Sequence, residues 1–292
     1  MGNGPEIRRG QLIAPFGVGA MVDFPDETLM SAGLDFWPSE ISDANYKASI
    51  LDATKIIDTR LQQQLSAILK RPINYFLLPT EGTDRTGYSL GSQTPEKQDM
   101  PFVRFPSWCF CPRCKIMERI GLEQKKLLKC SSMKRISEGN AKPCGDLPHK
   151  YRPILKPIRF LIACENGHID DFPWFNWLHK DGHCSGDVNN VGSGNLFFKS
   201  TAQPGLSGIV VHCIKCNKKR SMSGAFKKNV LIDYMPDASC SGRKPWLGSN
   251  IENDKFCNAI PQTIQRGASN TYFANTMSSI LIPPYSKSIL TM

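Results

Sequence analysis

The sequence predicts an α+β fold of mixed short strands and a few helices, organised around two or three small cysteine-rich modules. Three observations support this. The chain has 292 residues, of which 40% are apolar, so it can bury a core. Its apolar runs are short and are separated by turn residues, which is typical of short strands. It also contains 11 cysteines, four of them in two Cys-x-x-Cys pairs.

The first 35 or so residues have short apolar runs punctuated by glycine, which predicts short strands and tight turns. One helix is predicted between Asp52 and Arg71, because its apolar residues recur with the 3.6-residue period and Pro72 ends it. That apolar face belongs to the core or meets a partner helix. Its residues are Ile57, Leu61, Leu65, Ile68 and Leu69.

The polar segment 81–101 is rich in Gly, Thr and Pro, which predicts a loop or a domain boundary. Beyond it, four apolar runs predict strands: RFLIAC, NLFFKS, GIVVHC and NVLIDYM. The segment FPWFNWLH predicts a short helix, with Asp171 as its cap and Pro173 in its first turn. We expect three domains, which are an N-terminal α+β domain at 1–100, a basic zinc module at 101–157 and a second zinc-containing α+β domain at 158–292.

The positive charge is concentrated in one segment. Residues 1–100 carry a net charge of −4, residues 101–160 a net charge of +10 and residues 161–292 a net charge of +4. A basic segment of this kind favours an anionic partner, most plausibly nucleic acid. The alternative is a solvated basic face without a ligand.

The sequence has no stretch near the ~20 apolar residues that cross a bilayer, so we expect no membrane role. The N-terminal residues lack a hydrophobic run followed by a small-residue cleavage site, which favours a cytoplasmic protein over a secreted one. Cysteines in a reducing compartment are seldom paired as disulfides, so their number points to metal or catalytic roles.

The first cysteine cluster has the spacing C-x2-C-x15-C-x13-C, with ligands Cys111, Cys114, Cys130 and Cys144. Zinc takes four soft donors in a tetrahedron, and a Cys-x-x-Cys turn directs two thiolates to one point. Four thiolates leave no open position, so the predicted zinc is structural. Cys109 is expected to take no part.

A second structural zinc is predicted at a looser pattern, C-x2-C-x23-C-x16-C, formed by Cys213, Cys216, Cys240 and Cys257. The alternative is that the last two cysteines are separate buried thiols.

The segment between these clusters holds Cys164, His168, His179 and Cys184, which could close a third tetrahedral site. Two other interpretations stay open. Asp170 and Asp171 could cap the following helix beside a hydrogen-bonded histidine. Alternatively, His168 with these two carboxylates could form a metal-dependent hydrolase site.

Several long motifs occur in order along nearly the whole chain. They are GQLIAPFGVGAMVDF, GLDFWP, CPRC, RFLIACENGHIDDFPWFNWLH, CIKCNKKRSMSGAF, CSGRKPWLG and QRGASNTYF. These motifs resemble the DrmB family, the helicase-partner subunit of bacterial DISARM antiphage systems. The resemblance implies a DrmA-like helicase as partner, DNA binding by the complex, and a subunit that is neither the motor nor the nuclease.

The resemblance also extends to single residues. Cys111, Cys114, Cys213, Cys216, Cys240, Cys257, Cys164 and His168 stand where the family pattern has them. Arg243 and Arg266 match as well, and each could contact DNA phosphate or a partner, or bridge the zinc modules. Family members are usually about twice as long, so a separate chain could supply the second half.

Together these observations predict a non-enzymatic, zinc-stabilised subunit that partners a helicase and contributes to DNA binding. The basic residues expected to follow the phosphates are Lys125, Lys126, Lys129, Lys134 and Arg135. The alternatives are a protein-interaction scaffold without its own DNA contact and, less favoured, the hydrolase centred on His168, Asp170 and Asp171.

Overall fold

The structure is a computed structural model of the chain. It describes residues 17–24, 26–36, 55–77, 102–122, 127–134, 142–180, 184, 195–235, 239–249, 257–268, 271–272 and 274–280. The predicted loop at 81–101 lies outside these residues, and so do Lys125, Lys126 and Arg135.

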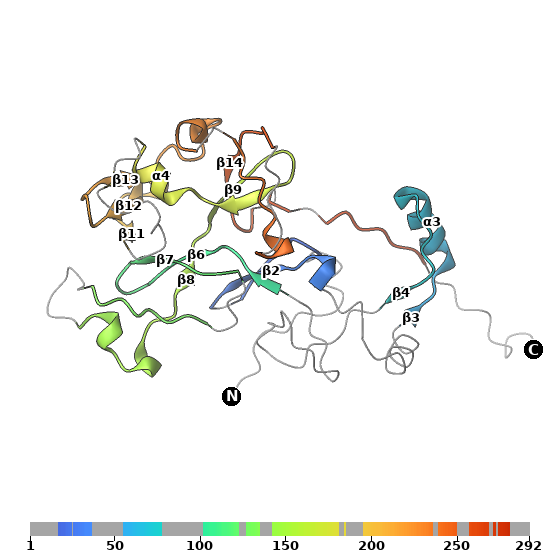
Figure 1. Ribbon diagram of the computed structural model, residues 1–292, viewed down its shortest axis with the longest axis horizontal. Helices are drawn as coiled ribbons and strands as arrows, with labels where there is room; N and C mark the ends of the chain where they lie inside the picture. The colour runs from blue at the N-terminus through green and yellow to red at the C-terminus, as the bar shows by residue number, and fades with distance from the viewer. Residues whose placement is uncertain are drawn as a thin grey trace, which may run out of the picture.

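The described chain forms small antiparallel sheets with few helices, which confirms the predicted fold class (Figure 1). One sheet has the order β1-β2-β5, from Met21–Asp23, Thr28–Ser31 and Phe102–Arg104. A second has the order β7-β6-β8, from Met117–Arg119, Trp108–Phe110 and Lys156–Pro157. A third has the order β10-β9-β14, from Ile169–Asp171, Phe160–Ala163 and Gln262–Gln265.

Two further sheets lie at opposite ends of the molecule (Figure 1). The sheet β11-β12-β13 consists of Leu196–Ser200, Ile209–Cys213 and Lys219–Ser221. Strands β3 (Lys55–Ile56) and β4 (Phe76–Leu77) form a two-stranded sheet beside α3. Three of the four predicted strand runs are therefore strands, namely β9, β11 and β12. The fourth, NVLIDYM, is instead the 3-10 helix η6 (Val230–Asp233), which follows Asn229 in the left-handed conformation.

Helix α3 (Thr59–Leu69) confirms the helix predicted between Asp52 and Arg71. Asp58 caps it by accepting a hydrogen bond from the Leu61 N–H at 3.0 Å, and Lys70 closes it with a left-handed φ of 52°. No residue of α3 is buried, so its apolar face does not belong to the core of the described chain.

Helix α4 (Trp174–Leu178) is the short helix predicted in FPWFNWLH, but Asp171 does not cap it. The N-cap position is held by Pro173, without a side-chain hydrogen bond. The Asp171 carboxylate instead accepts hydrogen bonds from the backbone of Ser107 and Trp108. The remaining helical turns are η1 (Leu34–Phe36), η2 (Cys144–Asp146), η3 (His149–Tyr151), η5 (Gly205–Gly208) and η8 (Pro245–Leu247).

The largest core cluster is aromatic and joins α4 to the sheets around β9 and β11. Trp174 lies 4.7 Å from Phe172 and 5.7 Å from Phe198, measured between ring centroids. A second buried cluster consists largely of cysteines, with Ile116, Ile120, Leu155 and Phe197 packed around them. A cluster of this kind has little apolar surface of its own, so its stability depends on what the thiols bind.

Strand pairing links distant parts of the chain. β2 pairs with β5 through Met30 and Val103, and an isolated bridge joins Ile116 to Phe197. The division into domains at residues 100 and 157 stays a prediction. Among the described residues, no helix is long and apolar enough to cross a membrane.

Candidate metal centres

The first candidate centre unites the four cysteines that the sequence predicted. Cys111, Cys114, Cys130 and Cys144 are all buried, and their sulfur atoms lie within 4.8 Å of one another. Cys111 and Cys114 come from the turn between β6 and β7. Lys115, directly after the second cysteine, has a left-handed φ of 63°, and the Cys114 N–H points to the Cys111 sulfur at 3.4 Å. This tight turn directs both sulfur atoms to one point.

Four thiolates packed together would repel one another, and a bound cation would offset this repulsion. Hydrogen bonds from the neighbouring Cys114 and Cys130 lower the pKa of Cys111 to about 2. The same contact with Cys111 raises the pKa of Cys114 to about 12, and that of Cys130 also rises. The contacts among these sulfur atoms thus favour ionisation of Cys111 and oppose that of Cys114 and Cys130. A divalent metal favours all four thiolates at once, which is the form that ligates.

The second candidate centre consists of Cys164, His168, Cys240 and Cys257. Cys164 and His168 flank the turn between β9 and β10, where Gly167 has a φ of 82°, and the Cys164 N–H donates to the His168 carbonyl. The Cys164 sulfur lies 3.5 Å from His168 Nδ1 and 3.9 Å from the Cys257 sulfur. N–H groups of Asn166 and Gly242 point to the sulfurs of Cys257 and Cys240.

The third candidate centre consists of His179, Cys184, Cys213 and Cys216. His179 lies at the end of α4, and its Nδ1 is 3.1 Å from the Phe175 carbonyl. That contact fits an Nδ1–H donor, which would leave Nε2, 3.2 Å from the Cys216 sulfur, as the atom able to bind a metal. Burial lowers the pKa of His179, which favours the neutral imidazole that binds metals.

The sequence-based grouping of the last two centres is wrong. Cys213 and Cys216 do not share a group with Cys240 and Cys257, nor do Cys164 and His168 share one with His179 and Cys184. Strand pairing explains why these pairs of residues have other partners than the spacing predicted. β14 pairs with β9 so that Gln262 faces Ala163, which brings Cys257 to Cys164, and the Cys240 N–H donates to the Ala259 carbonyl.

The partners of the Cys213–Cys216 turn are likewise set by packing. α4 lies on the β12-β13 hairpin, and the Trp177 indole N–H donates to the Ser221 carbonyl at 3.2 Å. His179, one residue beyond α4, therefore reaches the turn that follows β12. Asn217 after Cys216 repeats the left-handed conformation of Lys115, with a φ of 58°.

The distances between ligand atoms fit a tetrahedral metal. Zinc–sulfur bonds of ~2.3 Å imply sulfur atoms about 3.8 Å apart, and a ~2.0 Å bond to nitrogen implies about 3.5 Å between nitrogen and sulfur. The observed sulfur pairs are 3.9 Å for Cys111–Cys144, 3.6 Å for Cys114–Cys130 and 3.7 Å for Cys184–Cys213. Three groups of the described residues could thus hold metal ions. All 11 cysteines are free thiols, and Cys109 belongs to none of these groups.

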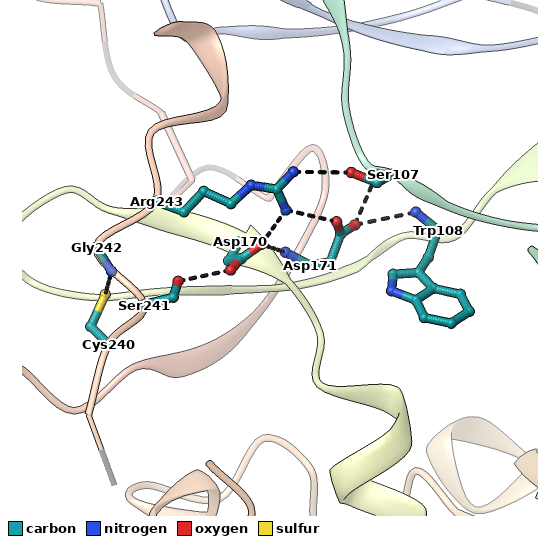
Figure 2. A network of polar contacts seen from close by, with 8 residues as sticks. All are labelled: Ser107, Trp108, Asp170, Asp171, Cys240, Ser241, Gly242 and Arg243. Carbon is teal, nitrogen blue, oxygen red and sulfur yellow. Dashed lines mark hydrogen bonds and ion pairs between the residues drawn. The ribbon is translucent and has the colours of Figure 1, made fainter. Parts of the chain in front are cut away.

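An ion-pair network fixes the second centre to the rest of the fold (Figure 2). Arg243 Nη1 lies 2.5 Å from Asp170 and 3.2 Å from Asp171, and its Nη2 reaches Ser107. Burial would lower the pKa of Arg243, but the charges of both carboxylates outweigh it and raise that pKa. Burial raises the pKa of Asp171, and Arg243 opposes this shift. The network joins Cys240, through its neighbours Ser241 and Arg243, to the strand that carries Asp170.

The residues of the hydrolase alternative are divided between two arrangements. His168 lies in a cysteine group, whereas Asp170 and Asp171 pair with Arg243. Neither carboxylate belongs to a group of metal ligands in the described part of the chain. The structure therefore places His168 in a group that could hold a metal and the two carboxylates in ion pairs with Arg243.

The structure describes four of the seven residues expected to contact DNA. The Lys129 amino group is exposed and donates to the His149 and Lys150 carbonyls. Lys134 is partly buried, lies 3.3 Å from Asn195 Oδ1 and has a pKa lowered first by burial. Arg243 is held in the network above, and Arg266 Nε lies 2.9 Å from Asp23. The DNA contacts of these residues stay predictions.

Sequence reasoning missed the residues that contact the candidate ligands. Asn166, which donates to Cys257, and the Phe175 carbonyl, which orients His179, have no motif of their own. One signal was available, because Cys-x3-His with a glycine before the histidine predicts two ligands on one tight turn. The pattern could not tell which second pair completes the group.

The fold and its three groups define the class of this protein, which is a mixed α+β chain whose small sheets are joined at Cys/His groups able to hold metals. The chain belongs to a family described as "Domain of unknown function (DUF8724)", which it matches over residues 8–273. It is similar to the DISARM protein DrmB of Bacillus paralicheniformis (strain ATCC 9945a / NCIMB 11709 / CD-2), with 30% identity over 188 residues. That match covers 64% of this chain and 29% of the relative, and it confirms the resemblance drawn from the motifs.

Proposed function

We propose that this chain is a non-catalytic, zinc-stabilised subunit of a bacterial antiphage defence complex, which partners a DNA helicase and contributes to DNA binding. The similarity to the DISARM protein DrmB is the observation that carries this proposal. The three Cys/His groups support it, because closed four-ligand groups are structural and leave no position for a substrate.

Zinc is the metal that these donor sets favour. One group offers four thiolates and the other two offer three thiolates and one imidazole each, in the spacing of a tetrahedron. Soft thiolates with imidazole in this geometry select zinc over the hard cations magnesium and calcium. Metal analysis of the purified chain tests this: we expect three zinc ions per chain.

The DNA contact is assigned to the basic segment around the first centre. Its predicted contact residues are Lys125, Lys126, Lys129, Lys134 and Arg135. Contacts with phosphates release counterions, so such binding is independent of sequence and weakens steeply with salt. Lys129 supports the assignment because its amino group lies at the surface of this segment, where it donates to the His149 and Lys150 carbonyls.

Fluorescence anisotropy with labelled single- and double-stranded DNA tests the contact. We expect the log of the binding constant to fall with log salt by about 0.7 to 0.9 per phosphate contact. Reversing the five charges should abolish most of this slope, whereas the matched control Lys227→Glu with Lys228→Glu, two exposed lysines elsewhere, should leave it intact. An unchanged slope in the five-residue variant would contradict the assignment.

The helicase partnership is tested by co-purification with a DrmA-like helicase from the same kind of system. If the basic segment meets an acidic face of the partner instead of DNA, partner binding weakens with salt and the chain alone has no DNA affinity. That result would favour the scaffold alternative. Because the match spans 29% of the relative, the same experiment should include any separate chain similar to the remainder of that relative.

We infer a cytoplasmic, non-enzymatic role, in keeping with reduced thiols and with His168 lying among cysteines. Metal-dependent cleavage of DNA or nucleotides that disappears in His168→Ala, with the other two metals retained, would contradict the non-enzymatic role.

A further inference from the structure

A cavity of about 660 Å³, lined by none of the residues of the three Cys/His groups, lies where the loop after β1 meets β8, β9, β11, the start of β12 and the end of β14. This volume is within the ~300–1,000 Å³ range of ligand sites. Phenylalanine rings line it: Phe24, Phe110, Phe160 and Phe198. Phe160 and Phe198 belong to the core, whereas Phe24 and Phe110 are half-buried and present ring surface to the cavity.

The rim of the cavity carries charges that do not cancel. Asp26 pairs with Lys156 at 2.5 Å, and Glu27 pairs with Arg104 at 2.9 Å. Asp23 pairs with Arg266 at 2.9 Å. Each of these three carboxylates therefore has a cation beside it.

Arg159 is the cation left over. It lines the cavity, is exposed and forms no ion pair with any residue that the structure describes. The described residues that line the cavity include the carboxylates of Asp26 and Glu27 and the cations of Lys156, Arg159 and Arg266, so positive charge is in excess there. A guanidinium such as that of Arg159 binds the oxygens of phosphate or carboxylate through two parallel N–H groups.

Arg266 adds a second incompletely satisfied guanidinium to the same cavity. Its Nη1 is buried and has no hydrogen-bond partner in the described part of the chain. Burial lowers the pKa of Arg266, and the positive charge of Arg159 lowers it further, opposed by Asp23. Two cations held close together in this way are stabilised by an anion placed between them.

We propose that this cavity binds one nucleotide unit of a nucleic-acid strand, with the base against Phe24 and Phe110 and the phosphodiester on Arg159 and Arg266. A phosphodiester carries one negative charge, which matches the one uncompensated cation. Flat aromatic bases stack on phenylalanine rings, and guanidinium groups bind phosphate oxygens, so the two halves of the site suit the two halves of a nucleotide. A carboxylate of a partner peptide would use the arginines but not the rings.

The inference rests on the proposed DNA contact in its choice of ligand, but it concerns a different surface. Of the basic residues assigned to phosphate tracking, the two that the structure describes, Lys129 and Lys134, do not line the cavity. Sequence-independent tracking and capture of one unstacked nucleotide can therefore fail separately.

The test is a calorimetric titration of the full chain with the dinucleoside monophosphate dTpdT, which has one phosphodiester and two bases. Arg159→Ala should weaken binding by about tenfold or more, the effect of losing a charged hydrogen bond. Phe24→Ala should weaken it by about fivefold or more, the effect of losing one stacking partner. Arg119→Ala is the matched control, because Arg119 is an exposed strand arginine outside the cavity, and it should bind as the unaltered chain does.

Each outcome separates this inference from the proposed function. Salt-dependent binding of long DNA without any effect of Arg159→Ala or Phe24→Ala on dTpdT would overturn the nucleotide site and leave the DNA-binding subunit standing. Loss of dTpdT affinity in both variants would support the site even if charge reversal of the basic segment had no effect. Binding of an acidic peptide that depends on Arg159, without binding of dTpdT, would overturn the inference and indicate a peptide carboxylate as the occupant.

Discussion

The grouping of ligands gives the sharpest prediction, because double substitutions count metal sites directly. In the structure Cys213 and Cys240 belong to different groups, whereas Cys164 and Cys240 belong to one. Cys213→Ala with Cys240→Ala should therefore remove two of the three metals. Cys164→Ala with Cys240→Ala should remove only one. The grouping expected from sequence spacing gives the opposite result for both pairs.

The loss of stability expected in these variants follows from how structural zinc stabilises small modules. Apparent binding free energies of ~10–16 kcal/mol per site are comparable with the whole stability of a domain, ~5–15 kcal/mol. Loss of a ligand at one centre should therefore unfold the segment around it. Once Cys240 is absent, removing Cys164 should lower the free energy of unfolding only a little further, because the same centre is already lost.

The assay is zinc content by elemental analysis together with native mass spectrometry, which shows the distribution of metal occupancy. Cys109→Ala is the matched control: Cys109 is buried and close to the first centre but belongs to no group, so the variant should keep all three metals. Equal metal loss in the two double variants, or a greater loss for Cys164 with Cys240, would refute the reasoning.

The remaining predictions concern single positions around the centres. Asp171→Ala should lower the free energy of unfolding by about 2–5 kcal/mol, because two backbone N–H groups lose their acceptor and Arg243 loses one carboxylate. Asp171→Asn should lower the free energy of unfolding by less, and urea unfolding measures both variants. Lys115→Gly should be tolerated at its left-handed φ, whereas Lys115→Val should lower stability by about 1–2 kcal/mol or more, measured by thermal unfolding in the presence of zinc. Acidification should release the metals as thiolates and imidazoles take up protons, and a zinc-sensitive dye should detect free zinc rising as pH falls.

Much of the chemistry could be read from local sequence patterns. The two Cys-x-x-Cys turns, the Cys-x3-His turn and the strands that carry them are short-range features, in which side-chain spacing and a left-handed or glycine position set the geometry. The grouping of the first candidate centre was predicted correctly, because its four cysteines lie on one stretch of chain whose strands β6, β7 and β8 pair with one another. The helix at Thr59–Leu69 followed from its apolar period and from Pro72 after its end.

Other features depended on contacts that no local pattern encodes. The segment NVLIDYM has the composition of a strand, but it pairs with no strand that the structure describes, and a 3-10 helix follows the left-handed Asn229 instead. Asp171 precedes a helix as a cap would, yet its carboxylate lies against Ser107 and Trp108, more than sixty residues earlier in the chain.

The sequence by itself determined the ligand inventory, the first centre, the excess of basic residues in one segment and the family resemblance. Tertiary structure alone decided how the other eight candidate ligands divide into two groups and which cations surround the cavity. The physical reason is that a two-ligand turn is complete within a few residues, whereas the partner that closes its tetrahedron is chosen by strand register and helix packing. The pairing of β14 with β9 brings Cys257 to Cys164, and the seating of α4 on β12 and β13 brings His179 to Cys216.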